Sequence, residues 1–488
     1  MMHEACRVAL ARAAGISYPP APPFDPGSQF PEYPWGASIC DGPNHAYPAV
    51  RAALAALGMD GEHLGTPRWN PLGGVVQSGD MVLIKPNLVC EEREGRPGEF
   101  EQIVTSASVV RAVLDYVLIA LGGKGRVVIA DSPQTDSDFD LTTQRTGLAA
   151  MVETMRSRAR VPVDLLDLRT ERWIVKDGVC TGRIPLPGDP AGYVKVDLGG
   201  ASHFERSTGS ASFYGAAYDT GVTNRSHSGG RHVYEVSGMA LSADVIISIP
   251  KLKTHKKCGM TGCLKGMVGL AGNKNMLPHY RFGPPSEGGD QFPDGRRGGR
   301  IENLAVKAAK RMVLRGGRAA GAAARVLKPL GYGIFGSTRE VVRSGNWHGN
   351  DTTWRMVLDL AAIITFCGRD GAIGDTPRRR FFNVVDGIVG GQGNGPLDAD
   401  PAPAGVILAG SSPLAVDAVS AAAAGFAPID IPLLKGGFES PWSLAPCPPE
   451  AVETILGSDG EVLSGFGSFP PVYMFERHFG WRRDREGR

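Results

Sequence analysis

A cluster of basic side chains follows an apolar, β-branched run at residues 244–250 of the sequence. Five cations fall within the next seven residues, and they are Lys251, Lys253, His255, Lys256 and Lys257. Cationic groups directly after a buried strand are costly to remove from water unless an anion meets them. The pattern therefore predicts an anion-binding site, and the alternative is a solvated turn that happens to be rich in lysine.

More polar side chains follow within the same stretch, which ends at Tyr280. The candidate substrate-binding residues are Lys251, Lys253, His255, Lys265, Asn273 and Lys274. His279 is the first candidate for moving a proton, because an unperturbed imidazole titrates near neutral pH. A histidine with a purely structural role is the alternative at this position.

Charged residues also end four of the predicted strands. These residues are Lys85, Asp131, Lys251 and Asp386. In open α/β sheets, ligands bind outside the carboxyl ends of the strands, so we expect the four to share one site. The lysines and the adjacent Asn87 would bind the anion. The two aspartates, as candidate catalytic residues, would orient the substrate or bind a divalent cation.

A glycine-rich segment, GIVGGQGNGP, follows Asp386 directly. Such a loop can present successive backbone N–H groups to an anion, and Gly393 and Asn394 are its candidate contacts. The alternative is a tight turn without a ligand. The segment matches neither of the glycine-rich phosphate-binding motifs that precede a helix, so it predicts no nucleotide cofactor.

Asp417 lies one turn inside a predicted helix that is otherwise rich in Ala and Val. A buried carboxylate requires a partner, because an isolated charge is costly in an apolar environment. A lysine of the basic cluster is a candidate partner for Asp417.

Short apolar runs alternate with longer amphipathic segments from about residue 75. The predicted strands are 81–85, 127–131, 163–168, 244–250, 382–386 and 405–410, and the predicted helices are 107–121, 141–156, 354–366 and 413–424. This alternation is typical of a parallel sheet covered by helices on both faces. The expected fold class is α/β with a mostly parallel, doubly wound sheet.

Two insertions interrupt the alternation, a loop-rich one at about 170–240 and a basic helical one at 300–345. The expected organisation is an N-terminal irregular arm and helix at 1–75, an α/β core domain at 76–430 and a C-terminal extension at 431–488. The basic insertion is expected to be a solvated helix or lid. Alternatively, it would lie on a membrane surface or contact an acidic partner.

The composition excludes several classes of protein. A net charge of +2 over 488 residues argues against nucleic acid as a partner. No signal peptide and no bilayer-spanning apolar stretch is visible, so we expect a cytoplasmic protein. The eight cysteines are irregularly spaced and form no CxxC pair, which argues against a metal site. Cys258 and Cys263 are expected to be packing residues, with a redox or metal role as the alternative.

Four segments together resemble the family called the domain of unknown function 362. They are residues 82–88, 249–269, 384–396 and 409–426, and the resemblance covers about 78–430 without the insertions. Several members of that family carry a ferredoxin-like module with clustered cysteines, which implies a redox link. This sequence has no such cysteine run, so no iron–sulfur cluster is expected.

The leading interpretation is an enzyme that acts on an anionic small molecule, either phosphorylated or carboxylated, with its reaction class and cofactors unknown. Two alternatives remain open. One is a redox partner that docks an iron–sulfur or flavin protein. The other is a non-catalytic module that binds anions or a membrane surface.

Overall fold

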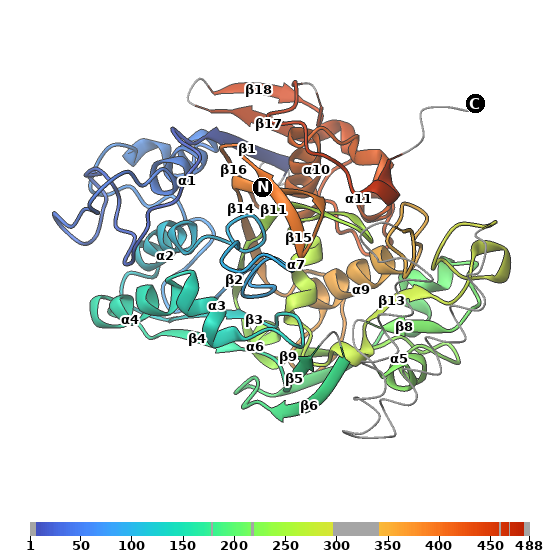
Figure 1. Cartoon of the computed structure of the whole chain (residues 1–488). Helices are drawn as coiled ribbons and strands as arrows, with labels where there is room; N and C mark the ends of the chain where they lie inside the picture. The colour runs from blue at the N-terminus through green and yellow to red at the C-terminus, as the bar shows by residue number, and fades with distance from the viewer. Residues whose placement is uncertain are drawn as a thin grey trace.

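The structure, a computed structural model, describes residues 6–176, 179–215, 219–295, 341–457, 460–467 and 469–482. Within these residues, a mixed sheet of twelve strands runs through the molecule (Figure 1). Nine strands follow the order β18-β17-β1-β16-β14-β10-β2-β3-β4, and β11, β12 and β15 join at its side. Their bounds are β1 (Arg7–Arg12), β2 (Met81–Pro86), β3 (Arg126–Asp131), β4 (Val163–Asp167), β10 (Val245–Ile249), β11 (Lys251–His255), β12 (Gly259–Thr261), β14 (Arg380–Asn394), β15 (Asp398–Ala402), β16 (Val406–Gly410), β17 (Glu453–Leu456) and β18 (Glu461–Ser464).

The centre of the sheet is parallel. Strands β14, β10, β2, β3 and β4 all run in one direction, whereas β16 is antiparallel to both of its neighbours, β14 and β1. The predicted α/β class with a mostly parallel sheet is therefore confirmed. Because parallel strands share their direction, the carboxyl ends of β10, β2 and β3 meet at one edge.

Both faces of the sheet are covered by helices. Along β2, Val82 and Ile84 pack into one core, whereas Leu83 between them packs into another, as the two-residue period of a strand requires. Figure 1 shows the two helical layers on opposite sides of the sheet. One layer holds α1 (Ala46–Ala56), α2 (Ala107–Leu121), α3 (Phe139–Arg145) and α4 (Leu148–Arg158), and the other α9 (Thr353–Phe366), α10 (Pro413–Ala423) and α11 (Pro432–Phe438).

The predicted helix at 141–156 is wrong as a single element, because it is divided into α3 and α4. Gly147 lies between them with φ of +73°, in the left-handed region. A Cβ atom at this position would lie 2.8 Å from the ring of Phe24. The break therefore depends on a contact with the N-terminal arm, which local helix propensity does not report.

The glycine-rich segment after Asp386 is a strand and not the predicted anion-binding loop. It continues β14 as far as Asn394 and pairs with β15, so its backbone N–H groups serve the sheet rather than an anion. A Cβ atom at Gly391 would lie 2.5 Å from the carbonyl oxygen of Gln102. A Cβ atom at Gly395 would lie 2.1 Å from the carbonyl oxygen of Thr254. The glycines allow close packing of backbones.

The insertion at about 170–240 forms three antiparallel pairs, two within the insertion and one with β13, in line with the predicted antiparallel or loop-rich lobe. The pairs are β5 (Glu171–Lys176) with β6 (Val179–Pro185), β7 (Tyr193–Asp197) with β9 (Val233–Ser237), and β8 (Phe213–Gly215) with β13 (Pro278–Arg281). The basic insertion lies mostly outside the described residues, since 296–340 are not among them. No helix in the described part of the chain is long and apolar enough to cross a bilayer.

The two ends of the chain meet in the main sheet. Strand β1 lies between β16 and β17, so the N-terminal and C-terminal segments both contribute to the sheet of the core. A disulfide joins Cys6, next to β1, to Cys447, with a Cα–Cα distance of 6.2 Å. This disulfide was not predicted from the sequence, because the two cysteines are 441 positions apart and their spacing gives no sign of a pairing.

We expect the substitution Cys447→Ser to lower the stability of the protein. The disulfide closes a very long loop of the unfolded chain, and in the chain-entropy model such a crosslink contributes about 3–5 kcal/mol. Unfolding in denaturant without reductant measures the difference. The half-buried, unpaired Cys40 provides the control Cys40→Ser. Equal midpoints for Cys447→Ser and the unaltered protein would contradict the expectation.

Candidate functional site

A cavity of about 520 Å³ opens at the carboxyl edge of the parallel strands. Its wall is built from the ends of β2 and β3, from β11, from the short helix α7 (Cys263–Gly266) and from β13. Seven predicted site residues line it, and they are Lys85, Asn87, Asp131, His255, Lys265, Lys274 and His279. Lys256 and Lys257 also reach the wall, so the cavity has a strong excess of basic groups.

Lys85 and Asp131 form a buried ion pair at the base of this wall. Their Nζ and Oδ1 atoms are 2.9 Å apart, and each side chain is only 3% exposed. Asp131 Oδ2 also accepts a hydrogen bond of 2.7 Å from the backbone N–H of Leu88. Gly269 covers the pair so closely that a Cβ atom there would lie 2.2 Å from Asp131 Oδ1. The carboxylate thus holds the Lys85 Nζ in a fixed position at the cavity wall.

Lys265 is carried by α7 and is held differently. Among the described residues, its ammonium group has no hydrogen-bond or ion-pair partner. Burial lowers its pKa, and so does the nearby charge of Lys85, although Asp131 and Cys258 act in the opposite direction. A lysine without a counter-ion in a cavity wall is a site at which an anion would be stabilised.

Asp417 determines where α7 begins, and the predicted pairing of Asp417 with a lysine is wrong. Its two carboxylate oxygens accept hydrogen bonds from the backbone N–H groups of Cys263 (2.6 Å) and Leu264 (2.9 Å). A Cβ atom at Gly262 would lie 2.2 Å from Asp417 Oδ1. Burial raises the pKa of Asp417 to about 6, against the lowering effect of these bonds. The unpaired N–H groups of a helix start meet the need for a partner as well as a lysine would.

Lys274 reaches the cavity from the loop that precedes β13. Its Nζ donates a hydrogen bond of 2.7 Å to the carbonyl oxygen of Val268. The residue is 9% exposed, and burial lowers its pKa to about 7, with the positive charges of Lys265 and Lys85 acting in the same direction. Lys274 is therefore partly deprotonated at neutral pH.

The two histidines of the cavity carry their ring proton on different nitrogen atoms. His255 Nδ1 accepts a hydrogen bond of 3.1 Å from the backbone N–H of Lys257, which leaves the proton of the neutral ring on Nε2. His279 Nδ1 lies 3.1 Å from the carbonyl oxygen of Leu277, so its proton is on Nδ1 and Nε2 is an acceptor. Burial and the neighbouring lysines lower the pKa of both rings well below the usual value, so both are neutral near pH 7.

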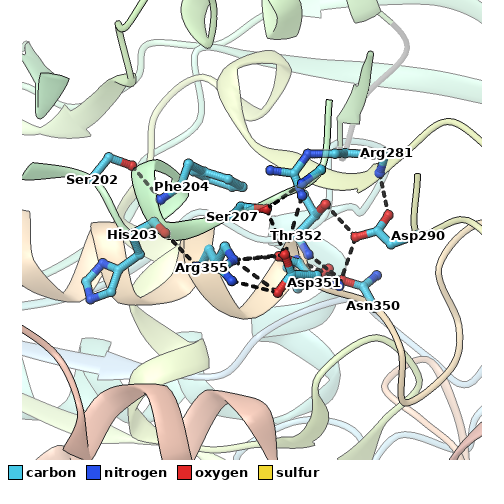
Figure 2. Close-up of polar contacts among 12 residues, drawn as sticks. Ser202, His203, Phe204, Ser207, Arg281, Asp290, Asn350, Asp351, Thr352 and Arg355 are labelled. Atoms are coloured by element: carbon cyan, nitrogen blue, oxygen red, sulfur yellow. Dashed lines mark hydrogen bonds and ion pairs between the residues drawn. The ribbon is translucent and has the colours of Figure 1, made fainter. Parts of the chain in front are cut away.

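A polar network fixes the strand that carries His279 (Figure 2). Asn350 Nδ2 donates a hydrogen bond of 3.0 Å to the carbonyl oxygen of His279. Asp290 accepts hydrogen bonds from the backbone N–H of Arg281 and, at 2.6 Å, from Thr352 Oγ1. The network joins β13 to the start of α9, so the position of the imidazole depends on a helix that is distant in sequence.

The structure does not bring all the predicted site residues together. Lys251 and Asp386 form a second ion pair of 2.6 Å, in which both side chains are fully buried and which does not line the cavity. Tyr18 donates to Asp386 and accepts from Lys251. Strands β10 and β2 lie between β14 and β3, so three strand spacings of about 4.8 Å separate the strand of Asp386 from that of Asp131. The predicted single site is therefore two separate ion pairs at one edge.

Four other candidates also lie outside the cavity wall. Lys253 Nζ donates to Asn87 Oδ1 at 2.9 Å and to the carbonyl oxygen of Ile103, so it supports Asn87 from behind. The Asn273 side chain accepts from the backbone N–H of Asn275 and caps a short turn. Gly393 and Asn394 belong to the β14–β15 pairing, so their predicted role in an anion-binding loop is wrong.

Sequence reasoning missed two parts of the wall. Ser132 and Gln134 follow the end of β3, and the strand-end argument that found Asn87 could have found them. Trp173, in β5, reaches the cavity from the insertion, and no sequence signal connects that segment with the sheet edge. The part of the chain that the structure describes contains no group of three or more His, Cys, Asp or Glu residues that could hold a metal ion.

Comparison with known proteins supports the resemblance seen in the sequence. Residues 82–189 and 208–422, more than half of the chain, match the family described as a domain of unknown function (DUF362). The chain belongs to this family. None of the curated proteins matches the sequence. Among solved structures, a protein from Thermotoga maritima is similar at 10% identity and a TM-score of 0.28. The match covers 67% of this DUF362 chain and 49% of that protein.

We expect Lys251→Met to destabilise the protein by about 3–5 kcal/mol, because it leaves the buried Asp386 without its ammonium partner. Lys251 was predicted to bind the anion, but its ion pair with Asp386 indicates a structural role instead. Unfolding in denaturant gives the free energy, and Lys265→Met is the matched control because it breaks no ion pair. Full stability of Lys251→Met would mean that the pair contributes nothing.

The buried lysines predict an unusual dependence of stability on pH. Burial lowers the pKa of Lys253, like that of Lys274, to about 7, whereas a lysine in the unfolded chain titrates near 10.4. Between these values the unfolded chain binds more protons than the folded one, so these residues make the free energy of unfolding rise with pH from about 7 to 10.

Lys253→Met should reduce this slope, and Lys435→Met, at an exposed position, should leave it unchanged. Denaturant unfolding at several pH values between 7 and 10 measures the slope for each variant. The slope is informative even though Lys253→Met also removes two hydrogen bonds, because that loss does not vary with pH. An equal slope in all three proteins would show that Lys253 remains charged when buried.

Proposed function

We propose that this DUF362 protein is an enzyme that binds a phosphorylated or carboxylated small molecule in the cavity and moves a proton on it. The observation that supports this most strongly is the arrangement of the cavity wall. It combines a lysine without a counter-ion with two neutral imidazoles of opposite hydrogen-bonding character.

Each part of the wall has a distinct role in this proposal. Lys265 attracts the anionic group. Lys85, which is paired with Asp131 and also donates to the carbonyl oxygen of Pro86, has one N–H left to donate to that group. His279 accepts a proton from the substrate at Nε2. His255 donates a hydrogen bond from Nε2–H to a substrate oxygen on which negative charge develops, so the two rings provide a general base and a neutral hydrogen-bond donor at neutral pH. Such a pair suits reactions that shift a proton between two atoms of the substrate.

The redox-partner and membrane-surface alternatives have no comparable support among the described residues. The basic segment that the membrane alternative requires falls mostly on residues 296–340. A cytoplasmic location and the absence of an iron–sulfur cluster stay predictions from the sequence.

Phosphate or sulfate at millimolar concentration should raise the melting temperature more than chloride at the same ionic strength. A ligand at 100 times its dissociation constant adds about 2.7 kcal/mol to stability. Lys265→Met should lose most of this response and fold at least as well as the unaltered protein, because it removes a charge that has no partner. The exposed Lys435→Met should keep the full response. An unchanged response in Lys265→Met would place the anion elsewhere.

The proton-transfer role is tested separately. Phosphorylated and carboxylated metabolites that raise the melting temperature should exchange a C–H proton with deuterated water in the presence of the protein, as NMR detects. His279→Gln should slow this exchange at least about 100-fold, the usual contribution of a general base. It should retain the anion response, because the neutral ring adds no charge. Exchange at the full rate in this variant would remove His279 from the mechanism.

A further inference from the structure

We propose that Lys274 forms a Schiff base with an aldehyde or ketone group of the bound anion. The substrate class is then a phosphorylated or carboxylated carbonyl compound. This inference rests on the proposed function, because it uses the same cavity, but it assigns a covalent step that anion binding and proton transfer do not require.

The surroundings of Lys274 suit a neutral amine better than an ammonium ion. Its Nζ has one hydrogen-bond acceptor, the carbonyl oxygen of Val268 at 2.7 Å, and no carboxylate within ion-pair distance among the described residues. An amine can satisfy this acceptor with one N–H and still keep its lone pair for attack on a carbonyl carbon. Lys85 contrasts with it, since a carboxylate lies 2.9 Å from its Nζ.

Burial is the main cause of the lowered pKa of Lys274; among the nearby charges Asp131 raises this pKa, and three cations lower it. Lys265, Lys85 and Arg169 are its positive neighbours, and Asp131, already paired with Lys85, is the negative one. Because the pKa is lowered to about 7, a substantial fraction of the Lys274 side chains carries a free amine near neutral pH. For an unperturbed lysine the fraction is roughly one in a few thousand. A nucleophilic lysine is commonly activated in this way, by desolvation and a second cation.

Other lysines with altered surroundings meet these conditions less well. Lys253 is buried with a similarly lowered pKa, but it donates to two oxygen atoms and lies outside the cavity wall. Lys265 lies on the wall without a partner and is the group that the proposed function uses for the anion. Lys274 therefore combines access to the cavity with an amine that is not needed as a counter-ion.

The residues of the cavity complete the covalent step. The amine of Lys274 adds to the carbonyl carbon, and the proton that leaves nitrogen goes to the carbonyl oxygen, which gives a carbinolamine. An acid then protonates the hydroxyl group, the C–O bond breaks, and water leaves while nitrogen forms the C=N bond of an iminium ion. The proton for this dehydration comes from solvent water in the open cavity. The neutral His255 can donate a hydrogen bond from Nε2–H to the departing oxygen, and His279 is a base that can then take a proton from the carbon next to the iminium.

Pyridoxal 5′-phosphate is a suitable probe, because it carries both an aldehyde and a phosphate. The full-length protein is incubated with it at pH 7 and reduced with borohydride, which converts the C=N bond to a stable secondary amine. Peptide mass spectrometry then locates the label. We expect Lys274 to be labelled at least tenfold more than the exposed Lys435, and millimolar phosphate to protect Lys274 alone.

The pH profile separates an activated amine from one that is merely accessible. Labelling of Lys274 should level off above about pH 8, whereas labelling of the exposed Lys435 should continue to rise with pH beyond that point. Lys274→Arg keeps the positive charge but cannot form a Schiff base, so its total labelling should fall to the level of the exposed lysines. Lys253 should stay unlabelled, which shows that a lowered pKa without access to the cavity is not enough.

Labelling of Lys274 at or below the level of Lys435 would overturn the proposal, and so would a shift of the main label to Lys265. If phosphate still raises the melting temperature in that case, the Schiff base fails and the anion site stands. If neither labelling nor the phosphate response is seen, both fail. Should Lys274→Arg not fold, the site of labelling, its phosphate protection and its pH profile in the unaltered protein decide the question.

Discussion

The cost of removing lysine ammonium groups from water governs this edge of the sheet. For Lys85 and Lys251, an ion pair with a carboxylate offsets this cost. The N–O distances are 2.9 Å to Asp131 and 2.6 Å to Asp386, and both pairs are almost fully buried. Lys253 donates only to oxygen atoms of neutral groups, so its burial is not offset by a carboxylate and its pKa is lowered. The lysines that reach the cavity without a carboxylate are those that can respond to a ligand, because an anion there replaces a missing partner.

The geometry of the cavity depends on backbone approach as much as on charge. Gly269 lies against the Lys85–Asp131 pair, and Gly262 lies against Asp417, each at a distance that no side chain could share. These contacts fix both ends of the segment that carries Lys265. A further hydrogen bond, from Ser132 to the carbonyl oxygen of Ala271, holds its carboxyl end. These glycines thus serve packing between distant segments, and so do Gly391 and Gly395 in the separate segment that was expected to form an anion-binding loop.

Several functional residues are positioned by parts of the chain that contain no site residue. His279 is held through its own carbonyl oxygen by Asn350, just before α9, and the wall of the same cavity includes Trp173 from the insertion. Tyr18, from the N-terminal arm, completes the hydrogen bonding of the Lys251–Asp386 pair. The core, the arm and the insertion therefore form one site environment, although the sequence suggested separate segments.

The sequence by itself determined the fold class and the edge at which polar residues gather. The two-residue period of strands such as 81–85 and the charged residues at their ends are local properties, so they can be read without knowing any partner. The cap of α2 is local in the same way, since the Ser106 side chain accepts a hydrogen bond from the backbone N–H two positions later. Only the tertiary structure decided which lysines are paired, because their partners are remote in sequence, as with Lys251 and Asp386, 135 positions apart. The charge state of a buried amine depends on desolvation and on the distance to the nearest carboxylate, and strand order sets both.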